Sequence, residues 1–186
     1  MRNLICRWAI VSRHYLWSFS TSSLLIAFAS IGSPGWAQSA LEPVQVEREG
    51  SWLGGLYMNQ NSGRFLCAME TRLTDGSVFR INYYGLRNTF LEVTTGERIA
   101  HGSFQTELLF LSDNRPSLLL PAFVEKDFII VEMTNDAVAG ELVQIIARAH
   151  TLTVMNRGTA LFDVPVNGSA RALELMGVCA RTLHRN

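Results

Sequence analysis

The sequence predicts an α+β fold: a mainly antiparallel β-sheet, arranged as a sandwich or a partly open barrel, with two helices in the C-terminal half. From residue 64 to residue 133, short runs rich in β-branched and aromatic residues alternate with turns that contain Gly, Asp or Pro, which is typical of strands joined by hairpins. After residue 136, apolar residues recur every three or four positions in two segments, as they do on amphipathic helices. With 186 residues, 48% of them hydrophobic, the chain can form one domain with an apolar core.

Residues 1–37 have the three parts of a secretory signal peptide. Three arginines and no acidic residue lie in this segment, residues 24–31 are apolar, and Gly35-Trp36-Ala37 places small residues at the first and third positions before a cleavage site. The alternative is an uncleaved membrane anchor, which needs roughly 20 mainly apolar residues, whereas several serines interrupt this run. We expect a cleaved leader, export to the periplasm, and no stable membrane span once the leader is removed.

The rest of the chain is expected to be a polar lead-in at residues 38–50 and a single β-rich domain at residues 51–186. The predicted strands cover residues 64–73, 77–84, 90–93, 104–111, 117–123 and 128–133. The first two flank Thr74-Asp75-Gly76, and the side-chain pattern selects their register. A three-residue loop pairs Thr71 with Phe79 and Cys67 with Tyr83, which gives one apolar face, with Gly76 as the left-handed residue of a bulged turn.

The remaining elements are a helix, a hairpin and a second helix. Asp136 is a plausible N-cap for a helix that ends near His150. A hairpin with a turn at residues 156–158 follows. Residues 167–169 then open the last helix, with Ser169 as its expected cap. Gly177 in that helix either allows close packing against the sheet or faces solvent.

Two cysteines remain after removal of the leader, Cys67 and Cys179. Cys179 lies on the apolar stripe of the last helix, and Cys67 lies on the apolar face of a strand, so both are expected to point toward the core. An even pair in an exported chain favours a disulfide, and the alternative is two buried free thiols. No C-x-x-C or H-x-x-x-H motif is present, so we expect no metal site and no cofactor.

The C-terminal part of the chain shows a family-like pattern. It consists of Leu152-Thr153-Val154, then the segment Phe162-Asp163-Val164-Pro165-Val166-Asn167-Gly168-Ser169-Ala170-Arg171-Ala172-Leu173, and the late Cys179. With the leader and the early Trp52, this resembles the small secreted alphaproteobacterial envelope proteins of the invasion-associated locus B type, which also end in a strand, a Gly turn and an Ala/Leu helix. The resemblance implies a periplasmic, non-enzymatic protein, and it transfers no site residue.

Motifs for catalysis and for nucleic-acid binding are missing from the sequence. It contains no G-x-S-x-G motif and no phosphate-binding Gly loop. Sixteen basic residues balance sixteen acidic ones, which excludes a strongly basic nucleic-acid binder. We therefore do not expect the protein to be an enzyme. An enzyme with an unfamiliar site would need a cleft that gathers several of four residues: His101, His150, Asp163 and Glu132.

Because these motifs are missing, surface recognition is the preferred function. Trp52 and Tyr57 lie beside the amide-rich residues 59–61, and Tyr84 follows Tyr83, so that the two rings lie on opposite sheet faces. Aromatic residues ringed by amides are typical of binding patches, although for Trp52 itself a place in the core is the favoured alternative. We expect a periplasmic binding or interaction module, inhibitor-like or immunity-like, whose partner is an envelope protein. The alternative is a structural cell-envelope protein without a dedicated ligand.

Overall fold

The structure is a computed structural model and describes residues 40–85, 89–96, 99–113, 117–133 and 135–183. Every described residue belongs to the second of the two units into which the chain divides, residues 34–186. The signal peptide expected at residues 1–37 lies outside the described residues.

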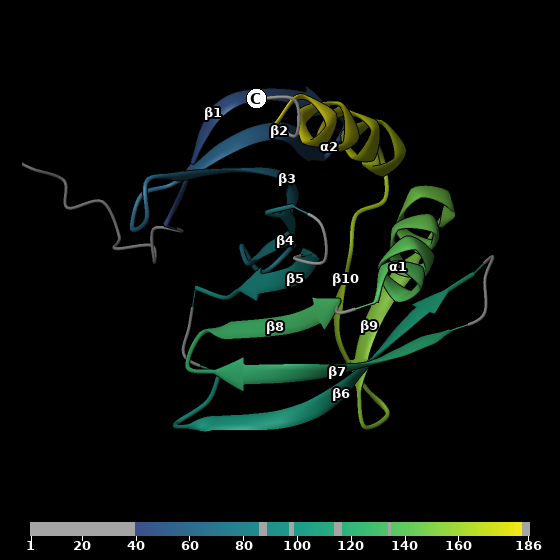
Figure 1. Ribbon diagram of the computed structural model, residues 1–186. Coiled ribbons are helices and arrows are strands. Elements are labelled where there is room, and N and C mark those ends of the chain that lie inside the picture. Colours follow the sequence, from purple (N-terminus) through teal and green to yellow (C-terminus); the bar gives the residue numbers. More distant parts are fainter. Residues whose placement is uncertain (1–39, 86–88, 97–98, 114–116, 134, 184–186) are drawn as a thin grey trace, which may run out of the picture. The chain divides into compact units, whose positions relative to one another are not determined.

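The second unit contains ten strands and two helices in its described residues (Figure 1). The first five strands are β1 (Leu41–Glu49), β2 (Trp52–Asn59), β3 (Arg64–Arg72), β4 (Val78–Tyr83) and β5 (Thr89–Thr94). The next three are β6 (Ser103–Ser112), β7 (Leu118–Glu125) and β8 (Phe128–Met133). The C-terminal half consists of α1 (Asp136–Arg148), β9 (Leu152–Asn156), β10 (Thr159–Asp163) and α2 (Ser169–Leu183).

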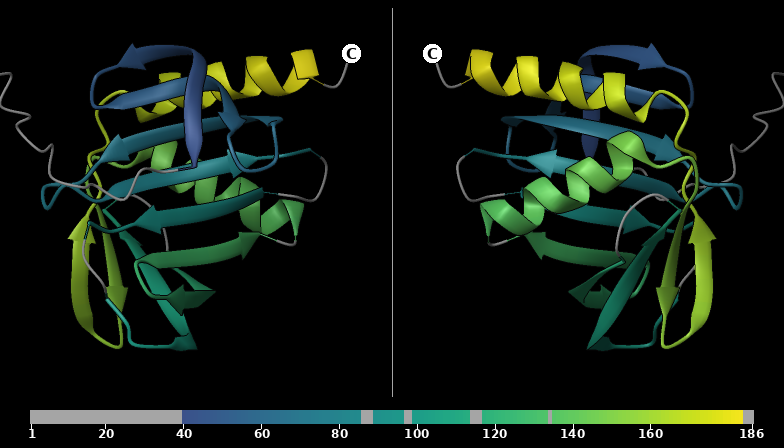
Figure 2. Two further views of the ribbon diagram at one scale, coloured as in Figure 1. Left: turned by 90° about the vertical axis from the view of Figure 1, so that its left-hand side faces the viewer. Right: turned by 90° about the vertical axis from the view of Figure 1, so that its right-hand side faces the viewer.

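All ten strands form one antiparallel sheet in the order β1-β2-β3-β4-β5-β8-β7-β6-β9-β10. Both helices lie on one side of it (Figure 2). The rings of Phe79 on β4 and Phe162 on β10 meet edge to face, with centroids 6.3 Å apart, although six positions separate these strands in the sheet order. The sheet therefore curls around a common core. This confirms the expected α+β fold, mainly antiparallel β with two helices in the C-terminal half.

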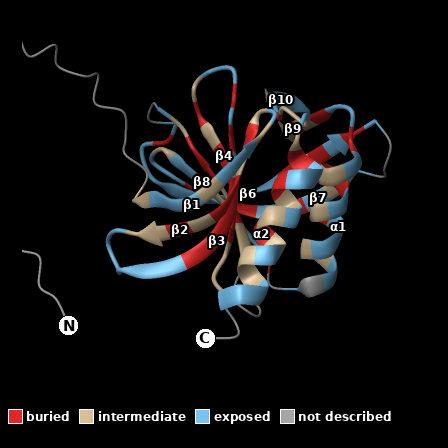
Figure 3. Ribbon diagram, turned by 90° about the horizontal axis from the view of Figure 1, so that it is seen from above, coloured by how far each residue is buried: buried red, intermediate tan, exposed pale blue. Residues whose placement is uncertain are grey.

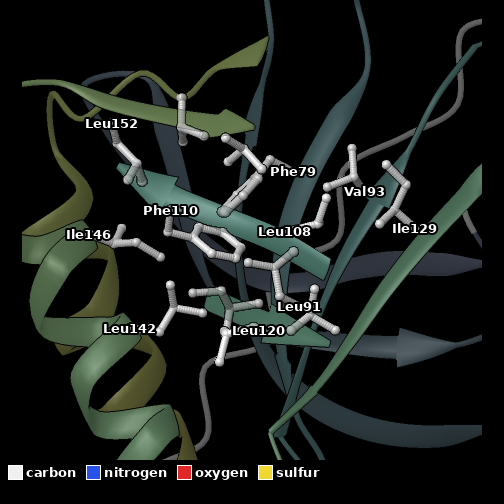
Figure 4. Close-up of a cluster of buried hydrophobic side chains, with 14 of the residues drawn as sticks. Phe79, Leu91, Val93, Leu108, Phe110, Leu120, Ile129, Leu142, Ile146 and Leu152 are labelled. Atoms are coloured by element: carbon white, nitrogen blue, oxygen red, sulfur yellow. The ribbon is translucent and has the colours of Figure 1, made fainter. Parts of the chain in front are cut away.

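The main core lies between the inner face of the sheet and the two helices. Buried residues gather where strands and helices meet (Figure 3). Leu142 and Ile146 of α1 point toward Phe110 and Leu120, which come from the two strands β6 and β7 (Figure 4). The predicted apolar stripe of α1 is confirmed, because Leu142, Ile145 and Ile146 are all fully buried. No helix among the described residues is long and apolar enough to cross a membrane.

The predicted pairing of β3 with β4 is confirmed. Thr71 lies opposite Phe79 and Cys67 lies opposite Tyr83, and Gly76 has a left-handed φ of 86°. The disulfide is also present: Cys67 of β3 and Cys179 of α2 are bonded, with Cα atoms 5.8 Å apart. It joins the last helix to an early strand.

Several local predictions were wrong. The segment expected to be a polar lead-in at residues 38–50 forms β1, and β2 follows it directly. The N-cap of α1 is Asn135, whose side chain accepts from the Ala137 amide, and not Asp136. The Ser169 hydroxyl does not cap its own helix, because it donates to the Ile146 carbonyl at 2.7 Å and so joins α2 to α1.

Gly177 is not in close contact with the sheet. A Cβ at this position would meet only the end of the Arg181 side chain, at 3.6 Å. Close packing against the sheet therefore does not explain this glycine.

Candidate functional site

The candidate site lies on the face of β1–β5 that points away from the helices. On this face, five residues pair across five neighbouring strands and form what we call the charged row: Arg48, Leu53, Glu70, Arg80 and Glu92. Neighbouring strands lie about 4.8 Å apart, so alternating charges are held at short, fixed intervals. The start of β1 crosses in front of this face (Figure 2, left).

Arg80 is the centre of the charged row. Its side chain is only 3% exposed and forms an ion pair with Glu70, in which Nε donates to Oε2 at 2.7 Å. Its Nη1 lies 3.6 Å from Oε1 of Glu92. Glu92 in turn accepts from the Asn82 amide at 3.2 Å and from the Thr94 hydroxyl at 2.8 Å. Arg80 is therefore held in place by a connected network of partners on both neighbouring strands.

A cavity of about 670 Å³ opens over this network. We call it the Arg80 pocket. Strands β1 to β5 and the turns between them form its walls. The lining includes Leu41, Arg48, Leu53, Arg72, Val78 and Arg80. Its volume lies within the range of about 300–1,000 Å³ that is usual for small-ligand sites.

The pocket carries an excess of positive charge at its rim. Arg48 and Arg72 are exposed, and neither forms an ion pair with another described residue. The positive charge of Arg80, by contrast, is matched by two carboxylates. Arg80 with its two partners, Glu70 and Glu92, has a net charge of −1. Adding the two rim arginines brings the local total to about +1. The pocket can therefore attract an anion.

Two buried polar atoms near the charged row have no hydrogen-bond partner among the described residues: the Tyr57 hydroxyl and Oδ1 of Asn82. Burial, helped by the nearby charge of Glu70 and opposed by two arginines of the row, raises the pKa of Tyr57 above its ordinary value. Unpartnered polar atoms are rare in protein interiors, so this region is polar beyond what the fold requires.

The predicted aromatic binding patch is not formed. Trp52 is fully buried; its indole donates to the Pro165 carbonyl at 2.7 Å and its ring packs edge to face on Phe79. Tyr57 is also fully buried. Tyr84 is half-buried and stacks on Phe90, with its hydroxyl accepting from Asn59 at 3.3 Å. Two of the three predicted contact residues are therefore core residues.

The residues that an unfamiliar enzyme site would need are not brought together. Glu132 lines a second cleft, of about 790 Å³ on β6–β8, which contains none of the other three. Asp163 accepts from the Thr153 hydroxyl on the neighbouring strand. His101 and His150 are exposed. Within the described part of the chain, no group of three or more His, Cys, Asp or Glu side chains could hold a metal ion.

Sequence reasoning missed the charged row, although one signal was available. The register that pairs Cys67 with Tyr83 also places Glu70 opposite Arg80 on the other face of the same two strands. Two opposite charges at facing positions, in a run otherwise rich in apolar residues, indicate an ion pair. The contributions of β1 and β5 could not be found in this way. β1 was not predicted as a strand, and the pattern gave a strand at residues 90–93 without its register against the neighbouring strand.

No protein-family model, curated protein or solved structure matches this chain.

Proposed function

We propose that this protein is an exported binding module of the bacterial periplasm, and that it recognises an envelope protein through the Arg80 pocket. The proposal includes removal of the leader at residues 1–37 and formation of the disulfide after export. The pocket is the observation that carries it, because it is a concave, arginine-rimmed cavity on the face of the sheet that points away from the helices.

The energetics of the charged row support a role in binding. Burying an ion pair often gives no more stability than apolar side chains of similar size would give. Arg80 is nevertheless buried at 3% exposure between two glutamates that are 18% and 17% exposed. A sheet face with only a structural task would gain as much from apolar residues, so the polar network suggests recognition of a polar partner.

The scaffold suits this role because the pocket walls are fixed from the opposite side. Cys67 lies on β3, and its bond to Cys179 ties α2 to the sheet beneath the pocket. Trp52 on β2 is tied to the segment before α2 by its hydrogen bond to Pro165. A preorganised site loses less conformational entropy on binding. The resemblance of the C-terminal segment to the invasion-associated locus B proteins is consistent with a periplasmic location.

Photocrosslinking in living cells tests the proposal. A photoreactive amino acid is placed at Leu53, which is half-buried and lines the Arg80 pocket. The matched control carries it at Leu109, which is also half-buried but lines the second cleft. We expect a protein adduct at position 53 and none at position 109. Fluorescence of Trp52 establishes that both variants are folded.

Two results would contradict this proposal. An adduct at position 109 alone would move the binding site to the second cleft. Absence of an adduct at both positions would favour the alternative, a structural envelope protein without a dedicated ligand.

Export is tested separately, by N-terminal sequencing of protein recovered from the periplasmic fraction. A mature chain that begins near Gln38 supports cleavage of the leader. Recovery of a chain that begins near Met1 from the membrane fraction would indicate an anchor instead.

A further inference from the structure

We propose that the group received by the Arg80 pocket is a carboxylate attached to an apolar side chain or chain end. This inference rests on the proposed binding function and names the chemistry that the same site recognises. It follows from three properties of the site: the arginines at the rim, the net charge of the charged row together with Arg72, and the apolar walls.

The rim arginines supply the recognition of an anion. Arg48 and Arg72 line the cavity, and neither is neutralised by an ion pair with a described residue. A guanidinium presents several N–H donors in a planar fork that matches the two oxygens of a carboxylate. Arg80 is less suited to this part, because it donates to Glu70 and its charge is balanced by ion pairs with Glu70 and Glu92.

The net charge favours a monoanion. Arg48, Arg72, Arg80 and Glu70 line the cavity. With Glu92, which does not line it but forms an ion pair with Arg80, the local charges sum to about +1. A carboxylate would bring the local total to zero. A phosphate dianion would bring it to about −1 and would lie close to Glu70, which also lines the pocket. The charge balance therefore selects a carboxylate over a phosphate.

The walls add an apolar requirement. Leu41 and Pro43 of β1, Leu53 of β2 and Val78 of β4 line the same cavity as the arginines. A carboxylate alone would leave the accessible parts of these side chains in water, whereas a neighbouring apolar group would cover them and exclude water. An envelope protein can supply this combination from a C-terminal carboxylate after an apolar residue, or from Asp or Glu beside one.

Nuclear magnetic resonance titration of the mature, oxidised protein with small probes tests the inference. N-acetylleucine stands for a terminal carboxylate, N-acetyl-glutamyl-leucinamide for a side-chain carboxylate, and N-acetylleucinamide is the neutral control. We expect shift changes at residues of the pocket, with at least one acid binding about fivefold or more tightly than the neutral amide, which corresponds to one ion pair. Which acid binds more tightly distinguishes the two sources.

Charge-removing variants complete the test. R48Q and R72Q should each weaken binding of the preferred acid about fivefold, and the double variant should lose the preference for acid over amide. The matched control is R157Q, which removes an exposed arginine from the second cleft, and it should bind as the wild type does. Equal binding of acid and amide, or acid binding unchanged in the double variant, would overturn the inference. An adduct at position 53 would still support the proposed function in that case.

Discussion

Removal of the disulfide gives the largest stability change that we expect from this structure. The perturbation is the C67A/C179A double variant of the mature chain. The bond closes a loop with a sequence separation of 112 residues. In the chain-entropy treatment, a loop of this length stabilises the folded state by about 4.8 kcal/mol at 25 °C, because the crosslink restricts the unfolded chain. Total stabilities of single domains are only about 5–15 kcal/mol.

The assay is urea unfolding followed by the fluorescence of Trp52. Trp52 is a suitable probe because it is fully buried, and because the other three tryptophans lie within residues 1–37. We expect the variant to lose about 3–5 kcal/mol of unfolding free energy, and the dependence on urea to become steeper, since an uncrosslinked unfolded chain exposes more surface. Reduction of the wild-type protein should give the same midpoint as the variant.

A loss of less than about 1 kcal/mol, with an unchanged urea dependence, would refute the reasoning. It would mean that the crosslink does not restrict the unfolded chain as its sequence separation implies. A thiol titration serves as the control: the unfolded, unreduced wild type should show no free thiol among its mature cysteines.

Three further predictions follow from the buried polar groups and one turn. R80M should lower the free energy of unfolding by about 3–5 kcal/mol, because it leaves two carboxylates without their cation, and the triple variant R80M/E70M/E92M should recover at least half of this loss. Equal stabilities of R80M and the triple variant in urea unfolding would contradict this prediction. Y57F should be as stable as the wild type or more stable by about 1 kcal/mol, because the hydroxyl has no partner among the described residues. Because the pKa of Tyr57 is raised in the folded state, the wild type should lose stability as the pH rises above about 10, its unfolded value, and Y57F should lose less; a larger loss in Y57F would count against this account. G168A should destabilise the fold far more than G158A. Both glycines have similar φ values, 89° and 83°, but a Cβ at Gly168 would clash with the Glu49 carbonyl, while one at Gly158 would meet no atom within 4 Å. Equal melting temperatures of the two variants would contradict the clash.

The sequence predicted those elements whose side chains follow a regular apolar period. The β3–β4 register could be derived because only one of the two loop lengths places Cys67 and Met69 opposite Tyr83 and Ile81 on one apolar face. Helix α1 could be derived because its apolar residues form a stripe. Strand β1 could not be predicted, because most of its residues are exposed. Strand β2 was obscured by the consecutive glycines at positions 54 and 55.

The site was harder to predict than the fold, for reasons that lie in tertiary contacts. The burial of Trp52 depends on Pro165, which is 113 residues away along the chain. The charged row requires five strands in register, and its members look like ordinary solvent-facing charges when they are read one at a time. Burial of Tyr57 beside that row depends on the start of β1, a strand that the sequence pattern did not reveal.

Charge reversal at the pocket rim tests the central claim, that the exported domain binds its partner through the Arg80 pocket. The measurement is the yield of the in-cell adduct at position 53, in the wild-type background and in backgrounds that carry R72E or R157E. Both arginines are exposed, but only Arg72 lines the Arg80 pocket. We predict that R72E abolishes the adduct and that R157E leaves it unchanged. An adduct of equal yield in both backgrounds would contradict the account.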